Sequence, residues 1–172
     1  QEREKKHKEK WLIFITTDHG RDAQTGRNHG GQSERERTTW MTTNAQNLNT
    51  YFRDYQPAVV DIMPSIAHFL TIKFPQKQAF EIDGIALNKP VSAIMPEVKI
   101  FDNQLEVSWK ALEKKGKMKI WLSTTNHFEE GGEDQYQLIG TTDLAKEHLI
   151  IKDVPESSFY KIVLESPHNT LN

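Results

Sequence analysis

The stretch WLIFITTDHGRDAQTGRNHGG, residues 11–31, decides how the first half of this chain is interpreted. Its first five residues, 11–15, are apolar without alternation, which is typical of a strand covered on both faces in a parallel α/β sheet. Ligands of such sheets bind beyond the carboxyl ends of the strands, and Asp18 and His19 stand at that end. The pattern therefore predicts a buried strand that brings an acid and an imidazole to a binding edge.

Residues 18–33 form the loop that follows, because they are rich in Gly, Asn, Asp and Thr. His29 lies in this loop before two glycines, so it can fold back over the same edge. Carboxylate oxygens and imidazole nitrogens together suit zinc or manganese. The spacing predicts that Asp18, His19 and His29 are metal ligands; ordinary polar turn residues are the alternative.

Two further elements are predicted before residue 90. TTWMTT, residues 38–43, has the composition of a short strand. AVVDIMPSIAHFLTI, residues 58–72, indicates an apolar segment followed by a helix, for which Asp61 is a plausible N-cap. The predicted apolar stripe of this helix consists of Ile62, Ile66, Phe69 and Leu70.

The pattern changes near residues 90–96. Beyond Glu97, short stretches rich in Val, Ile, Tyr, Phe and Trp alternate apolar with polar residues, which indicates half-buried antiparallel strands. Several such strands separated by turns favour a small β-sandwich. We therefore expect an α/β unit at 1–90 and an all-β unit at 97–172.

Composition excludes several classes of protein. The 172 residues carry a net charge of -2 and no cysteine, which argues against a general nucleic-acid polymer as partner and against disulfides. No apolar run approaches the length of a membrane span. The first ten residues combine helix formers with mixed charge, which predicts an exposed helix end rather than a signal peptide.

The motifs of residues 1–90, taken in order, resemble a known family. WLIFITTDHG, NHGGQSERERTTWM, VVDIMPSIAHFLTIKFP and EIDGIAL are similar to the C-terminal part of the alkaline phosphatase superfamily catalytic domain. The likeness is greatest to its type I phosphodiesterase/nucleotide pyrophosphatase branch. The fold class implied is the C-terminal part of an alkaline phosphatase-like α/β/α sandwich.

This resemblance implies a phosphoric ester hydrolase with two divalent metal ions, zinc or else manganese, and a phosphate ester substrate. Asp18 and His19 would bind the ion that also holds the nucleophile, and His29 would bind the other ion. Arg21 is a candidate substrate contact. The nucleophile, a Thr or Ser in the family, is expected upstream of this chain and is not assigned to Thr16 or Thr17.

Since the family needs more ligands than these three, we expect the chain to be a fragment that is inactive alone. Its missing partner would be the N-terminal half of the catalytic domain. The parent protein is expected to be exported to the periplasm or the exterior, with its signal peptide upstream.

Residues 97–172 resemble a fibronectin type III-like sandwich. Trp109 stands where such folds have a core tryptophan on an early strand, and Tyr160 is placed on the penultimate strand. No convincing last strand follows SPHNTLN, residues 166–172, so the sandwich is expected to lack its last strand.

Three alternatives remain open from the sequence. A phosphomutase of the same superfamily is disfavoured by the appended sandwich, which is more typical of exported hydrolases. A calcium-dependent sulfatase is disfavoured because His29 suits zinc or manganese better. A non-catalytic β-sandwich binding module with a degenerate α/β remnant is the third.

Overall fold

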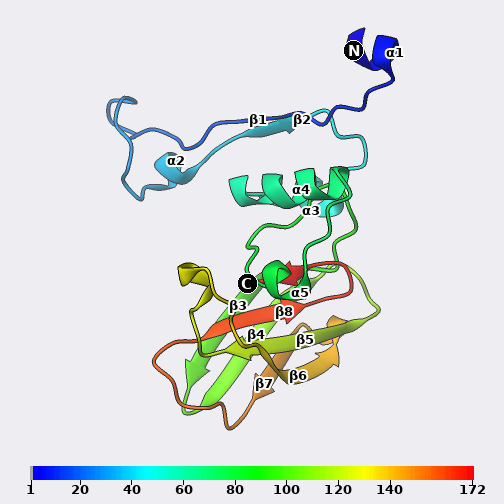
Figure 1. Ribbon diagram of the computed structural model, residues 1–172. Coiled ribbons are helices and arrows are strands. Elements are labelled where there is room, and N and C mark those ends of the chain that lie inside the picture. The colour runs from blue at the N-terminus through cyan, green and yellow to red at the C-terminus, as the bar shows by residue number, and fades with distance from the viewer. Residues whose placement is uncertain (1) are drawn as a thin grey trace.

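Three tiers of structure make up the chain in the computed structural model, which describes residues 2–172 (Figure 1). A two-stranded ribbon lies at one end, short helices lie in the middle, and packed β-sheets form the other end. The elements before the large sheets are α1 (Glu2–His7), β1 (Phe14–Thr16), α2 (Glu34–Arg37), β2 (Met41–Thr43), α3 (Thr50–Asp54), the 3-10 helix η1 (Val59–Asp61), α4 (Ile62–Phe69) and α5 (Gln76–Ala79).

The two predicted N-terminal strands exist, but their environment differs from the prediction. β1 pairs antiparallel with β2, with Ile15 opposite Thr42. Trp11, Ile13 and Ile15 are 48%, 47% and 54% exposed, so the predicted coverage on both faces is wrong. The physical reason is that these strands form a two-stranded sheet. Its face with Ile15 is open to solvent, and its face with Phe14 and Thr16 is only partly buried.

Helix α4 also buries a different face from the one predicted. Ile66 and Leu70 are 41% and 54% exposed, whereas Ser65 is completely buried. The Ser65 hydroxyl donates to the Asp61 carbonyl and accepts from the Leu87 amide, so the helix packs through its small residues. The predicted apolar stripe of Ile62, Ile66, Phe69 and Leu70 is therefore not the buried face of the helix. Two of these side chains face solvent instead.

Asp61 stands at the N-cap of α4, as predicted, but its carboxylate does not cap the helix. It accepts hydrogen bonds from the amides of Ala58 (2.7 Å) and Ile85 (2.6 Å). Burial raises the pKa of this carboxyl, and the two amide bonds partly offset that rise. Asp61 thus connects α4 to the segment that leads into the β-sheets.

Two antiparallel sheets account for the second half of the chain. Their strands are β3 (Ala93–Phe101), β4 (Gln104–Ala111), β5 (Lys117–Ser123), β6 (Gln137–Asp143), β7 (His148–Ile151), β8 (Lys161–Glu165) and β9 (Thr170–Leu171), with the 3-10 helices η2 (Phe128–Glu130) and η3 (Leu144–Lys146) between them. One sheet has the order β3-β4-β7 and the other β6-β5-β8-β9. The described chain is therefore mixed α and β, with antiparallel pairing in its sheets.

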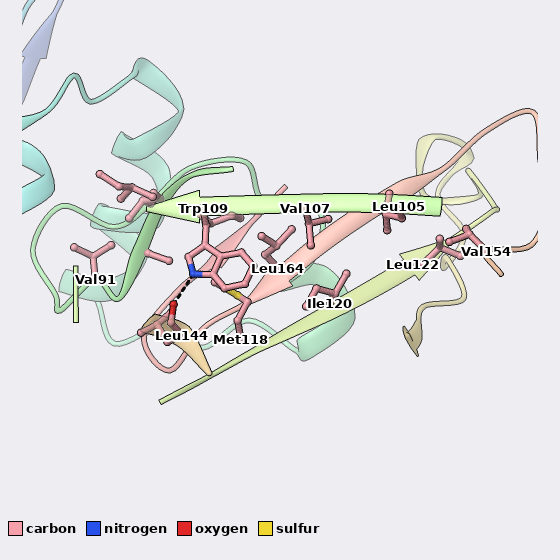
Figure 2. Packing of buried hydrophobic residues seen from close by; sticks show 14 residues of the cluster. Val91, Leu105, Val107, Trp109, Met118, Ile120, Leu122, Leu144, Val154 and Leu164 are labelled. Atoms are coloured by element: carbon pink, nitrogen blue, oxygen red, sulfur yellow. Dashed lines mark hydrogen bonds between the residues drawn. The ribbon is translucent and has the colours of Figure 1, made fainter. Parts of the chain in front are cut away.

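The two sheets share one hydrophobic core (Figure 2). Trp109 is 4% exposed, and its indole N–H donates to the Leu144 carbonyl at 2.8 Å. The buried apolar side chains of the core are Ile85, Val91, Ala93, Ile94, Leu105, Val107, Trp109, Met118, Ile120, Leu122, Leu144, Val154, Leu164 and Leu171. The alternating apolar positions of β4 and β5 therefore mark the inward faces of these two strands. In β3 the alternating residues Val98 and Ile100 are 42% and 47% exposed, so the expected burial is wrong there.

The sheet region extends from residue 93 to residue 171. β3 begins at Ala93, so the first strand includes part of the expected junction at 90–96. Its pairing slips between Ile94 and Glu97, where Pro96 has no amide to donate and Met95 has a φ of 55°. At the other end, β9 lies within residues 166–172 and pairs with β8.

The segment containing α5 packs on the outer face of the four-stranded sheet. The Phe80 ring lies 5.3 Å from Trp121 and 5.1 Å from Tyr136. The Lys161 ammonium donates to Glu81 (2.8 Å) and Asp134 (2.6 Å), whose carboxylates are almost completely buried. Aromatic contacts and a shielded charge cluster thus join the helical tier to the sheets.

Candidate metal centre

Asp18 and His19 form the first half of the candidate site, directly after β1. An Asp18 carboxylate oxygen, Oδ1, accepts the His19 amide at 3.0 Å. The other oxygen, Oδ2, lies 3.4 Å from His19 Nε2. The amide hydrogen bond lowers the pKa of Asp18, so this carboxyl favours its charged, metal-binding form. The Asp18 side chain is 86% exposed and that of His19 is 33% exposed.

The tautomer of His19 follows from its second contact. Its Nδ1 lies 2.6 Å from the Gly20 carbonyl oxygen, which can only accept a hydrogen bond. Nδ1 therefore carries the hydrogen, and in the neutral ring the lone pair is on Nε2, which faces Asp18. A second contact that fixes the tautomer in this way is common for histidines that bind metals.

His29 reaches this site from the far end of the loop. Its ring centroid lies 4.3 Å from that of His19, and the two ring planes are 24° apart. His29 therefore lies next to His19, close to the end of β1, where the sequence predicted that its loop could fold back.

Asp22 organises the loop between the two histidines. Its carboxylate accepts the amides of Thr25 (2.6 Å), Arg27 (3.1 Å) and Asn28 (2.7 Å) and the Thr25 hydroxyl (2.8 Å). These bonds lower the pKa of Asp22 strongly. A single ionised carboxylate thus fixes the path of the chain that leads to His29.

Helix α2 is hydrogen-bonded to the end of the loop that carries His29. Ser33 and Glu36 form a capping box, in which the Ser33 hydroxyl accepts the Glu36 amide and the Glu36 carboxylate accepts the Ser33 amide. Hydrogen bonds from the Ser33 hydroxyl and then the Gly31 amide lower the pKa of Glu36. Gly31 is two residues after His29, so the cap also contacts the histidine segment.

Arg21, the predicted substrate contact, is exposed and donates to the Arg27 carbonyl at 3.2 Å. Its guanidinium is therefore engaged with its own loop. An open groove with a volume of about 1060 Å³ lies beside the site and includes Asp18, Arg37, Trp40 and Tyr55 in its lining.

Asp18–His19 and His19–His29 are the pairs that the structure brings together. Across residues 2–172, no three side chains of His, Cys, Asp and Glu are grouped closely enough to hold a metal ion. The donor types nevertheless fit zinc or manganese: one carboxylate, one imidazole with a defined free nitrogen, and one neighbouring imidazole.

Asp22 and Glu36 are functional candidates that sequence reasoning missed. The signal for Glu36 was available, since Ser33 followed three residues later by Glu36 is a capping-box pattern. The role of Asp22 depends on which amides the loop turns toward it. Only the three-dimensional path of the loop reveals that.

Comparisons of the chain with protein-family models, curated proteins and solved structures gave no significant match. Among the helices described between residues 2 and 172, none has the length and apolar character needed to cross a membrane.

Proposed function

We propose that this chain carries part of the two-metal site of a phosphoric ester hydrolase related to the phosphodiesterase branch of the alkaline phosphatase superfamily. The observation that carries the proposal is the 4.3 Å approach of the His19 and His29 rings beside Asp18. The family resemblance assigns these residues to two adjacent ions. Their contact in space agrees with that assignment.

The ring geometry favours two ions over one. An imidazole binds a metal through a nitrogen lone pair in the plane of its ring. Because the two rings are stacked and nearly parallel, their lone pairs do not converge readily on a single point.

The residues of this chain would have distinct roles. Two bound ions would polarise the phosphoryl group and stabilise the attacking and leaving oxygens. Asp18 Oδ2 and His19 Nε2 would hold the ion on the nucleophile side, and His29 would hold the other. The Gly20 carbonyl keeps the hydrogen of His19 on Nδ1, so that Nε2 stays free for the metal.

The nucleophile and the remaining ligands are proposed to belong to an upstream part of the same protein. Three ligands are too few for two closed sites. The Thr16 hydroxyl donates to the Thr17 carbonyl at 2.9 Å, which supports leaving it out of the nucleophile role. The groove beside Asp18 offers room for a phosphate ester, and the Arg37 guanidinium in its lining has the charge to attract one.

We further infer that the C-terminal sandwich is fibronectin type III-like. Its support is the three-plus-four strand order, the core position of Trp109 on β4, and a tyrosine corner. The Tyr160 hydroxyl lies just before β8 and donates to the Pro155 carbonyl at 2.7 Å. A sandwich of this kind beside the hydrolase unit favours an exported parent protein.

The test is an assay of the full-length protein that contains these residues, on 4-nitrophenyl phosphate and bis(4-nitrophenyl) phosphate with zinc or manganese. We expect turnover that a chelator abolishes and that His19→Ala reduces by roughly 100-fold or more. The 172-residue chain alone should remain at metal-ion background. Absence of phosphoester turnover in the full-length protein with either metal would contradict the proposal.

A further inference from the structure

We propose that Glu36 is a positioning residue that holds the two histidine segments of the site together. Its main-chain carbonyl accepts the Gly20 amide at 2.7 Å, directly after His19. Its carboxylate Oε1 accepts the Gly31 amide at 2.9 Å, two residues after His29. One residue therefore contacts both segments through different atoms. This inference rests on the proposed metal site.

The capping box fixes the carboxylate that makes these contacts. Glu36 Oε2 accepts the Ser33 hydroxyl at 2.5 Å and the Ser33 amide at 3.4 Å, while Oε1 remains for Gly31. Both oxygens are thus used as acceptors. Glutamine could supply only one accepting oxygen, and aspartate is shorter by one methylene group, so glutamate suits this position best.

Close packing of α2 against both glycines supports the same role. A Cβ atom on Gly20 would lie 1.9 Å from the Arg35 carbonyl oxygen. A Cβ atom on Gly31 would lie 2.5 Å from Glu36 Oε2. Neither glycine has a positive φ, so the requirement arises from the approach of the helix rather than from a special turn. The residues beside both histidines are therefore shaped to accept α2.

Gly20 links Glu36 to the imidazole ring of His19. Glu36 fixes the Gly20 amide, and the Gly20 carbonyl fixes the His19 ring through Nδ1. The Gly31 contact fixes the loop that presents the stacked His29 ring. Loss of the Glu36 carboxylate would release the His29 side of this arrangement first, because that contact depends on the side chain.

Two readouts on the 172-residue chain test this role, one without metal and one with zinc. Without metal, nuclear Overhauser contacts between the His19 and His29 rings and amide exchange at Gly31 report the positioning. With zinc, the imidazole shifts of the two histidines report affinity. Glu36→Ala is the main variant, and Glu36→Gln is the conservative one.

Glu34→Ala is the matched control, because Glu34 is also an acid in the first turn of α2 and its side chain is exposed. We expect Glu36→Ala to lose the ring contacts, to speed Gly31 exchange by about 2- to 10-fold and to weaken zinc binding by about 10- to 100-fold. Glu36→Gln should show smaller changes than Glu36→Ala in ring contacts, Gly31 exchange and zinc affinity. Glu34→Ala should match the wild type in all three. Unchanged sheet resonances would show that each variant is folded.

Retention of the ring contacts and of Gly31 protection in folded Glu36→Ala would overturn the positioning role, whether or not the zinc affinity changes. Another outcome is that, without metal, Glu36→Ala differs from the wild type in ring contacts and Gly31 exchange while zinc shifts neither histidine of the wild-type chain. In that case the metal proposal fails and the role of Glu36 in positioning the two rings stands. Equal loss of zinc affinity in Glu34→Ala and Glu36→Ala would assign the effect to helix charge and contradict the specific role of Glu36.

Discussion

The imidazole rings of His19 and His29 lie 4.3 Å apart and 24° from parallel, although one follows β1 and the other precedes α2. Neither ring is held there by a hydrogen bond to the other. Their contact depends on the loop organised by Asp22 and on the helix capped by Ser33 and Glu36. The local hydrogen bonds of these supports are therefore the first targets for mutation.

Replacing Asp22 with alanine is expected to loosen the loop that carries His29. The amides of Thr25, Arg27 and Asn28 lose their shared acceptor and become free to exchange. Hydrogen exchange should accelerate at these positions and leave the β-sheets unchanged. Asp54→Ala is the control, since Asp54 is exposed in α3. Equal protection of the loop in Asp22→Ala and the wild type would contradict the role assigned to Asp22.

The same loop should remain ordered in mild acid. The folded-state pKa of Asp22 lies well below its unfolded value of about 3.9. A lowered carboxyl pKa gives stability that is complete above the unfolded pKa and is lost as the pH falls through the folded pKa. Amide protection at Asn28, corrected for intrinsic exchange, should therefore persist from neutral pH to about pH 4. Its loss well above the unfolded pKa would show that the carboxylate bonds do not hold the loop.

Lys161→Met should destabilise the chain strongly, because it leaves two buried carboxylates, Asp134 and Glu81, without their cation. Breaking one side of such a cluster costs about 3–5 kcal/mol. Denaturant unfolding measures this change. Lys77→Met is the matched control, since Lys77 pairs with Glu133 between largely exposed side chains and should change stability by less than about 1 kcal/mol. Similar effects of the two substitutions would contradict the buried role of Lys161.

This cluster also has a predicted pH dependence. Burial alone would raise the pKa of Asp134, but hydrogen bonds from Lys161, Thr125 and the His127 amide keep it at about 2. The stability that it provides should be lost as the pH falls from the unfolded value of about 3.9 toward the folded value. Asp134→Asn should lose less stability over that interval than the wild type. Equal acid sensitivity would contradict the assignment.

Two adjacent residues of α4 should differ sharply in their tolerance of substitution. Ser65→Ala leaves the buried Leu87 amide without its acceptor and should cost about 1–3 kcal/mol. Ile66→Ser changes a side chain that is 41% exposed and should cost much less in this chain. Thermal unfolding of both variants decides the matter. A larger loss of stability for Ile66→Ser than for Ser65→Ala would contradict this account and favour the apolar stripe predicted from the sequence.

The sequence predicted the β-strands better than the helical half because period-2 alternation reports burial directly. Leu105, Val107 and Trp109 alternate in the sequence and all three face the core. In residues 11–15 the apolar run predicts a strand, but coverage depends on neighbouring layers that a single segment does not encode. In α4, a serine hydrogen bond decided which side of the helix is buried, and hydrophobicity alone does not report it.

The sequence predicted the candidate ligands of the site better than the hydrogen bonds that position them. Asp18, His19 and His29 stood out through their position after a strand and in the adjoining loop. The tautomer of His19 and the contacts of Glu36 depend on backbone carbonyls and amides at Gly20 and Gly31. Such groups occur in every residue, so their roles emerge only from the folded geometry.

The most direct test of the central claim is a zinc titration of the 172-residue chain, followed through the imidazole resonances of its seven histidines. We predict that His19 and His29 shift first and together, and that Asp18→Asn weakens the response of His19. Zinc shifts spread evenly over all seven histidines, or confined to those outside the loop, would contradict the assignment of Asp18, His19 and His29 as metal ligands.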